Sequence, residues 1–157
     1  MRRMLNRDYE GQYCGVAKSL ELIGERWTML IVRDAFFGLK RFDQFHESLG
    51  VARNVLTDRL NTLVDAGIFE RVRYSERPER FEYRLTAKGR ELNVPLNALR
   101  EWGERHLLEK PPGVLRRRTD RKPVVTALVP KGTPSLSAAE VELVLLPWYV
   151  NERNGVS

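Results

Sequence analysis

Cysteine and histidine are nearly missing from this chain of 157 residues. Cys14 is the single cysteine, and His46 and His106 are the two histidines. One thiol excludes a disulfide within the chain and is typical of proteins in a reducing compartment. These three side chains match no metal-ligand spacing, so we expect neither a metal site nor another cofactor.

Long apolar segments are missing as well. The longest apolar run, Leu143–Val150, contains Pro147 and is too short to span a bilayer. Arg2 and Arg3 are followed by Leu5-Asn6-Arg7-Asp8 rather than by an apolar segment, so we expect no signal peptide. These absences predict a cytoplasmic protein without a membrane partner.

Enzyme motifs are a third absence. The sequence has neither a glycine-rich phosphate loop nor a serine-nucleophile motif. A thiol enzyme would pair Cys14 with His46 or His106, yet no third residue is evident that would orient such a pair. We therefore predict that the protein is not an enzyme, and a thiol enzyme stays as an alternative.

Apolar residues and positive charge are plentiful. Apolar residues make up 42% of the chain, which is enough to form a core, and the net charge is +6. Residues 51–90 carry nine Lys or Arg and six Asp or Glu, which is half of the excess. Affinity for duplex DNA is largely electrostatic, so this segment is where a nucleic-acid partner would bind.

The segment Arg41–Leu85 contains the most informative pattern. Apolar residues at helical spacing predict a helix over Phe42–Leu49 and a second over Arg53–Ala66, separated by a break at Gly50. Alternating residues then predict strands at Ile68–Tyr74 and Phe81–Leu85, on either side of a polar loop, Ser75–Arg80. A helix-turn-helix followed by such a wing is a device for reading duplex DNA.

The flanking segments complete a mainly α fold with one small β-hairpin. We expect helices at Val16–Ile23, Glu25–Phe37 and Ala87–Leu108, the last with a kink or break at Pro95. Residues 1–108 would form the DNA-binding and dimerisation domain, and 109–157 a C-terminal extension. In that extension, 123–129 has a strand-like composition, whereas 137–145 fits a capped helix or a strand equally well.

Candidate DNA-binding residues lie on the outward side of the second helix and on the wing. With Leu56, Leu60 and Leu63 buried, polar side chains that can bind bases or phosphates face outwards. The proposed set is Arg41, Arg53, Asn54, Thr57, Asn61, Arg77 and Arg80. The alternatives are an ordinary solvated helix face, and a hairpin in which Glu76 and Glu79 pair with the wing arginines.

Three further features are ambiguous. Cys14 precedes the first helix and is either a redox sensor or a small buried apolar residue. Arg59 either contacts phosphate or braces the fold through a carboxylate such as Asp65. The basic run 116–122 is either a source of extra phosphate contacts or a solvated cluster.

The order and spacing of these motifs closely resemble the HxlR family of bacterial transcriptional regulators. The resemblance covers about residues 10–108 and rests on several matching segments. They are Cys14, Leu20–Thr28, Ile31–Gly38, Arg41-Phe42, Leu56–Leu60, Leu63, Gly67-Ile68 and Tyr83–Gly89.

The resemblance implies a MarR-like winged helix, a homodimer formed through terminal helices, and binding to a pseudo-palindromic operator, which we expect to cause repression. Some members of the family sense electrophiles or oxidants through a cysteine near the start of the first helix, where Cys14 lies. Ala52 departs from the serine that often begins the recognition helix, so its cap is missing. The alternative function is an interaction or RNA-binding winged helix.

Overall fold

A computed structural model describes residues 9–154 and divides the chain into two compact units, 1–92 and 93–157. The division at residue 108 that the family resemblance implies stays a prediction.

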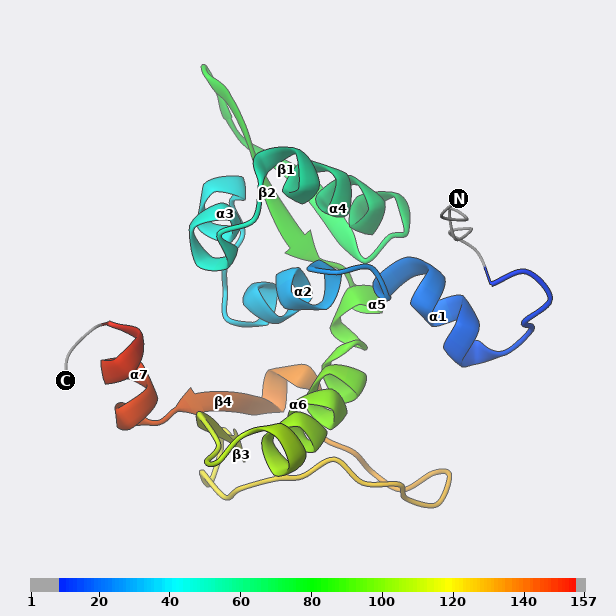
Figure 1. Ribbon diagram of the computed structural model, residues 1–157, viewed down its shortest axis with the longest axis vertical. Helices are drawn as coiled ribbons and strands as arrows, with labels where there is room; N and C mark the ends of the chain where they lie inside the picture. Colours follow the sequence, from blue (N-terminus) through cyan, green and yellow to red (C-terminus); the bar gives the residue numbers. More distant parts are fainter. Residues whose placement is uncertain (1–8, 155–157) are drawn as a thin grey trace, which may run out of the picture. The chain divides into compact units, whose positions relative to one another are not determined.

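The first unit is a bundle of helices with a projecting β-hairpin (Figure 1). Its elements, in chain order, are α1 (Gly15–Ile23), α2 (Thr28–Phe36), α3 (Phe42–Leu49), α4 (Arg53–Asp65), β1 (Phe69–Glu76), β2 (Glu79–Leu85) and α5 (Ala87–Arg90). The mainly helical winged helix-turn-helix fold is thereby confirmed, and α3 has the predicted bounds.

The core of this unit holds α2, α3 and α4 together. Leu56, Leu60 and Leu63 lie on one side of α4 and are fully buried against Phe45 of α3. Each such side chain contributes about 1.5–3 kcal/mol on burial. The remaining fully or nearly fully buried members are Ile31, Val32, Val51, Ile68 and Phe69. Because the three leucines of α4 are buried, the residues on the opposite side of this helix must face solvent.

The start of α2 differs from the sequence prediction. We predicted that α2 begins at Glu25, but it begins at Thr28, because Trp27 adopts a left-handed conformation with φ of 80°. Leu30 of this helix is 38% exposed, whereas Ile31 is fully buried. The two turns around α4 are made by Gly50 and Gly67, whose φ angles of 62° and 69° favour glycine.

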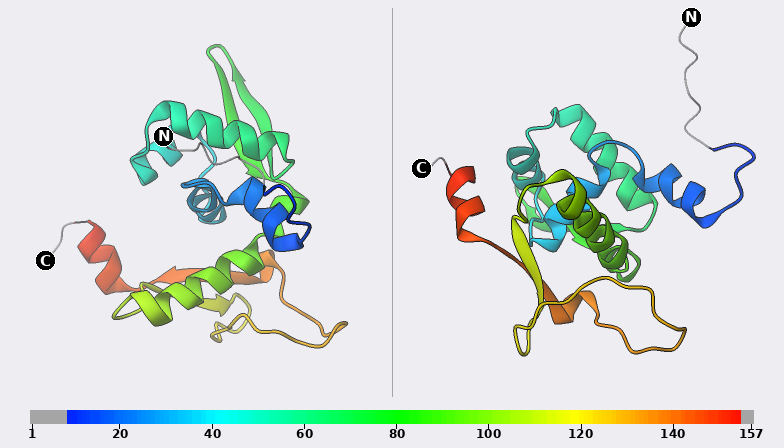
Figure 2. Two further views of the ribbon diagram at one scale, coloured as in Figure 1. Left: turned by 45° about the vertical axis from the view of Figure 1, so that its right-hand side comes forward. Right: turned by 60° about the horizontal axis from the view of Figure 1, so that its bottom comes forward.

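The wing is longer than the sequence predicted. Its antiparallel strands continue through Glu76 and Glu79, so the polar segment expected to be a loop is mostly strand and only Arg77-Pro78 connect the two. In the left view of Figure 2, the tip of the hairpin projects beyond the helices. The backbone N–H of Tyr83 donates to the carbonyl oxygen of Lys40 at 2.7 Å, which ties the wing to the start of α3.

The helix predicted at Ala87–Leu108 is broken in two. The first part, α5, is capped by the Thr86 hydroxyl, which accepts from the N–H of Gly89 at 3.0 Å. A turn at Glu91 and Leu92 separates it from α6 (Asn93–Leu107). Pro95 lies in the first turn of α6, where a missing N–H removes no helical hydrogen bond.

The second unit contains α6 and a second hairpin. Its β3 (Gly113–Arg117) pairs antiparallel with β4 (Val141–Leu145), and α7 (Pro147–Arg153) follows. Both alternatives for 137–145 occur in succession, because a 3₁₀ turn at Ala138–Glu140 opens β4. The strand predicted at Pro123–Val129 is wrong. Only Pro123 forms an isolated bridge, and Val125 and Leu128 project into solvent.

Candidate nucleic-acid interface

The proposed base-reading residues share the exposed side of α4. Arg53, Asn54, Thr57 and Asn61 are all exposed, opposite the buried leucines. The Thr57 hydroxyl donates to the Arg53 carbonyl oxygen at 2.9 Å. Among the described residues, Asn54 and Asn61 have no side-chain hydrogen-bond partner. Two amides that could each pair with adenine are therefore unengaged on this surface.

Arg53 is held by two consecutive residues of α3. Its guanidinium carbon lies 5.4 Å from the ring centre of Phe42, and Nη2 donates to Asp43 Oδ1 at 3.2 Å. Sequence reasoning did not find this contact, because the three residues come from different helices. The contact joins the start of α4 to the start of α3.

No side chain caps the first turn of α4. Ala52 is the residue before the helix, as the sequence indicated, and it makes no side-chain cap. The missing cap costs about 1 kcal/mol relative to serine. The preceding turn has a different support, since His46 Nδ1 lies 2.8 Å from the carbonyl oxygen of Val51. His46 thus helps to place the recognition helix, a role that its sequence position did not suggest.

Arg41 joins α3 to the wing. Its guanidinium carbon lies 4.5 Å from the ring centre of Tyr74 on β1, and Nε is 3.7 Å from a carboxylate oxygen of Glu82 on β2. A hydrogen bond from Arg84, supported by the charges of Lys40 and Arg41, holds the pKa of Glu82 below its usual value. The ionised carboxylate therefore keeps two arginines beside the wing.

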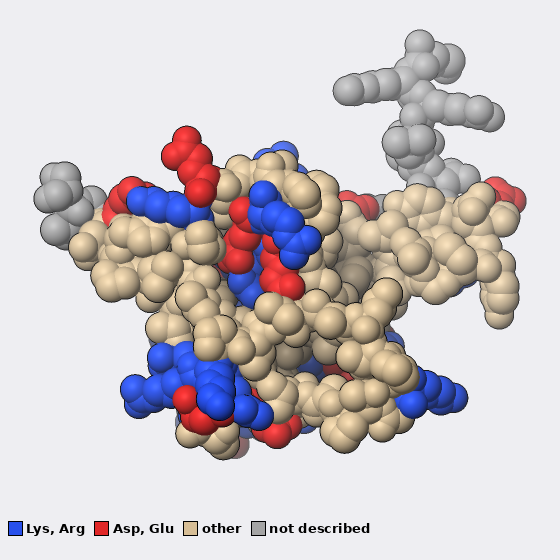
Figure 3. Space-filling model, turned by 90° about the horizontal axis from the view of Figure 1, so that it is seen from below, with Lys and Arg blue, Asp and Glu red and all other residues tan. Residues whose placement is uncertain are grey.

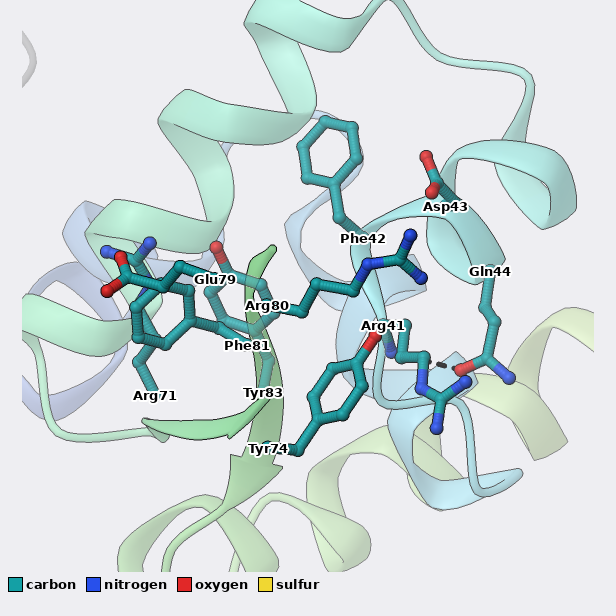
Figure 4. A pocket seen from close by; sticks show the side chains of 10 residues that line it. All are labelled: Arg41, Phe42, Asp43, Gln44, Arg71, Tyr74, Glu79, Arg80, Phe81 and Tyr83. Atoms are coloured by element: carbon teal, nitrogen blue, oxygen red, sulfur yellow. Dashed lines mark hydrogen bonds between the residues drawn. The ribbon is translucent and has the colours of Figure 1, made fainter. Parts of the chain in front are cut away.

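A groove of about 490 Å³ lies between the start of α3 and the wing. Arginine and aromatic side chains from both elements surround it (Figure 4). Its lining includes Arg41, Phe42, Tyr74, Arg80 and Phe81. The lining also contains the carboxylates of Asp43 and Glu79, but three arginines outnumber them, so the groove favours an anionic group such as a backbone phosphate.

The wing tip carries arginines with different partners. Arg73 pairs with Glu76 at 3.9 Å and with Glu79 at 3.4 Å. Within residues 9–154, no carboxylate lies within ion-pair distance of Arg77 or Arg80. The alternative predicted that Glu76 and Glu79 pair with the arginines at the tip, but both glutamates pair with Arg73 instead. The two exposed tip arginines are available for phosphate.

Arg59 braces the fold. It donates to Glu25 at 3.0 Å and to the carbonyl oxygen of Arg26 at 3.2 Å, and it pairs with neighbouring Asp58 at 2.6 Å. Its side chain is only 16% exposed. Of the two alternatives, bracing agrees with this geometry, although Asp65 is not the partner.

The basic run 116–122 is largely paired within the second unit. Arg116 and Arg118 share Glu142, at 2.8 and 3.1 Å, and Arg117 pairs with Asp120. The hydrogen bond from Arg117 lowers the pKa of Asp120. On the face drawn in Figure 3, acidic side chains likewise lie among basic ones. This pairing favours the solvated-cluster alternative over a phosphate site.

Cys14 is exposed and caps α1. Its Sγ accepts a hydrogen bond from the N–H of Ala17 at 3.3 Å. The alternative that it is a buried apolar residue is therefore wrong. No group of three His, Cys, Asp or Glu residues in the described part of the chain is arranged to hold a metal ion. The helices of residues 9–154 include none long and apolar enough to cross a membrane.

Comparisons with known proteins agree with this geometry. The model of the HxlR-like helix-turn-helix family matches residues 22–111. An uncharacterized HTH-type transcriptional regulator of Mycobacterium tuberculosis is 49% identical over 117 residues, which cover 73% of each protein. An uncharacterized HTH-type regulator of Synechocystis is 37% identical and covers 59% of this chain and 70% of the relative.

Solved structures give the same result. The proposed transcription factor PA1607 has a TM-score of 0.69 and 44% identity, covering 78% of this chain and 87% of its own. The redox regulator HypR in its reduced form has a TM-score of 0.56 and 32% identity, covering 59% and 92%. Because the family model spans more than half of the sequence, the chain belongs to the HxlR-like helix-turn-helix family of transcriptional regulators.

Proposed function

We propose that this regulator acts as a homodimer that binds a pseudo-palindromic operator and represses transcription. The observation that carries the proposal is the set of polar side chains on the outward side of α4 and on the wing. Asn54, Asn61, Arg77 and Arg80 are exposed there and have no side-chain partner among residues 9–154. Two copies of α4 would enter successive major grooves, with half-sites about 34 Å apart. The wings would contact phosphates on either side.

Exposed apolar residues on α1 and α6 support the dimer. Val16 of α1 is 70% exposed, and Leu99 and Trp102 of α6 are 59% and 57% exposed. Apolar side chains that recur at helical spacing on an exposed face are typical of interfaces. A second copy that covers them would also supply the second recognition helix.

Cys14 supports control by an oxidant. Its thiol is exposed and is the only one in the chain, so a switch would proceed by a disulfide between chains or by an adduct with a small thiol. Either product changes the group that caps α1. A relative of known structure, HypR, is named a redox regulator, which agrees with this proposal.

The experiment is a footprint on the DNA upstream of the regulator's own gene, at two salt concentrations, with and without oxidant. We expect two protected half-sites one helical turn apart, with protection that weakens as salt increases. A chain that binds only RNA or another protein would leave duplex DNA unprotected, and this outcome would exclude the proposal.

Two variants of Cys14 separate the proposed redox switch from the proposed DNA binding. Cys14→Ser replaces the sulfur acceptor that caps α1 with an oxygen acceptor, whereas Cys14→Ala removes the acceptor. We expect the serine variant to protect the operator with and without oxidant. If oxidant leaves wild-type protection unchanged, the Cys14 switch is excluded and the DNA-binding role remains.

A further inference from the structure

Arg53 begins the recognition helix, and its guanidinium is engaged on one side only. Asp43 accepts one hydrogen bond from Nη2, and the Phe42 ring lies 5.4 Å from the guanidinium carbon. A guanidinium group has five N–H donors, so four remain for another acceptor. Arg53 is 64% exposed, so these donors are accessible.

Asp43 is placed where an unpaired carboxylate would oppose DNA. It lies in the first turn of α3, beside the groove between α3 and the wing, and its side chain is 82% exposed (Figure 4). Next to phosphates, a carboxylate lowers affinity by repulsion. The positive charge of Arg53 offsets this repulsion, and the Asp43 carboxylate in turn holds the Arg53 guanidinium.

We propose that Asp43 and Phe42 are positioning residues that hold Arg53 in the orientation needed to read one base pair, so that Asp43 determines specificity without contacting DNA. The proposal rests on the proposed DNA-binding function and deepens it. A free arginine side chain loses considerable rotamer freedom when it pairs with guanine. Asp43 and Phe42 restrict that freedom in the unbound protein, and the bidentate contact with guanine then costs less.

The pairing predicts opposite effects on affinity and on specificity. Removing the Asp43 carboxylate removes a negative charge, so affinity for DNA of any sequence increases. Removal also releases Arg53, so preference at its base pair decreases. A residue that only stabilised the fold would lower affinity for every sequence, and a purely repulsive charge would leave preference unchanged.

The experiment is selection from a library of random 20-base-pair duplexes, followed by measurement of base preference at each position. The variants are Arg53→Ala, Asp43→Ala and the double variant, and Glu47→Ala is the matched control. Glu47 is an exposed carboxylate on the same helix, and within the described residues it has no ion-pair partner. Circular dichroism of each variant before the selection shows whether the variant is folded.

We expect Arg53→Ala to lower preference at one base pair of each half-site by about tenfold or more. Asp43→Ala should lower preference at the same base pair by about threefold to tenfold and tighten binding to the unselected library. In the double variant, loss of Asp43 should cause no further loss of preference. Glu47→Ala should tighten binding to the library without any change of preference.

Three results would overturn the proposal. Wild-type preference in Asp43→Ala would show that Arg53 needs no positioning. If Arg53→Ala changes no base position while wild type still enriches one sequence, Arg53 does not read a base, and the proposed DNA-binding function survives. If wild type enriches no sequence, the specificity proposal and the proposed function fail together.

Discussion

Neighbouring arginines of the wing differ in whether a carboxylate lies beside them, and this difference determines which of them are free to bind phosphate. Arg73 lies between two glutamates, whereas the side chains of Arg77 and Arg80 have no such neighbour in residues 9–154. An arginine that is already paired must give up its partner to bind phosphate. The sequence shows an equal charge at all three positions, and the register of the hairpin makes them different.

Replacing Arg77 or Arg80 with alanine should weaken binding to all duplex sequences alike. Each replacement removes one phosphate contact, so the slope of log affinity against log salt should fall by about one unit. Arg73→Ala is the matched control, and its slope should change less. Titrations of operator and unrelated duplex at four salt concentrations measure these slopes, and slopes equal to the wild-type value would exclude the wing contacts.

Among the secondary-structure elements, those with one strongly apolar side are predicted best. α3 has the predicted bounds, and α4 differs by one residue at its end. Buried Phe45 defines the inward side of α3, buried leucines define that of α4, and Gly50 and Gly67 follow the two helices. Apart from the isolated bridge at Pro123, the apolar residues of 123–129 form no strand, so its composition alone was misleading. The wing was predicted too short because its polar outer residues are strand residues that face solvent on both sides.

Gly89 should be far less replaceable than Gly103, although both lie in helices. A Cβ at Gly89 would lie 2.2 Å from the carbonyl oxygen of Ile68, whereas a Cβ at Gly103 meets nothing within 4 Å. Gly89→Ala must displace backbone that follows α4, and we expect a loss of about 2 kcal/mol or more. Gly103→Ala should gain up to about 1 kcal/mol, because alanine favours the helix.

Urea unfolding of both glycine variants at one protein concentration measures the free energy of unfolding. Keeping the concentration equal matters because a dimer's stability depends on it. Unchanged stability of Gly89→Ala would contradict the close approach of α5 to the chain that follows α4.

Recognition of the proposed two-fold operator would depend on the proposed homodimer, because one α4 would read only one half-site. Leu99 and Trp102 are apolar residues that lie exposed on one side of α6. On the opposite side of α6, Arg100 and Glu104 form a hydrogen-bonded pair with little exposure. We propose that a second copy of the chain covers this exposed apolar side.

Trp102→Ser should weaken the proposed homodimer by about 30-fold or more, because buried tryptophans are frequent centres of binding energy. The control is Leu128→Ser, since Leu128 is fully exposed in a loop and lies outside the proposed interface. Sedimentation equilibrium measures the dissociation constant of each. Equal dimer stability in the two variants would place the interface elsewhere.

The sequence by itself determined the family and the order of the helices, because these follow from the spacing of motifs along the chain. It also determined the outward residues of α4, because these follow from the periodicity of one helix. Only the tertiary structure decided which charges are compensated. Arg53 pairs with Asp43, Arg41 with Glu82 and Arg59 with Glu25, each across different elements. Such contacts depend on how helices and strands pack, and residues up to 34 positions apart in sequence come within hydrogen-bond distance only in the folded chain.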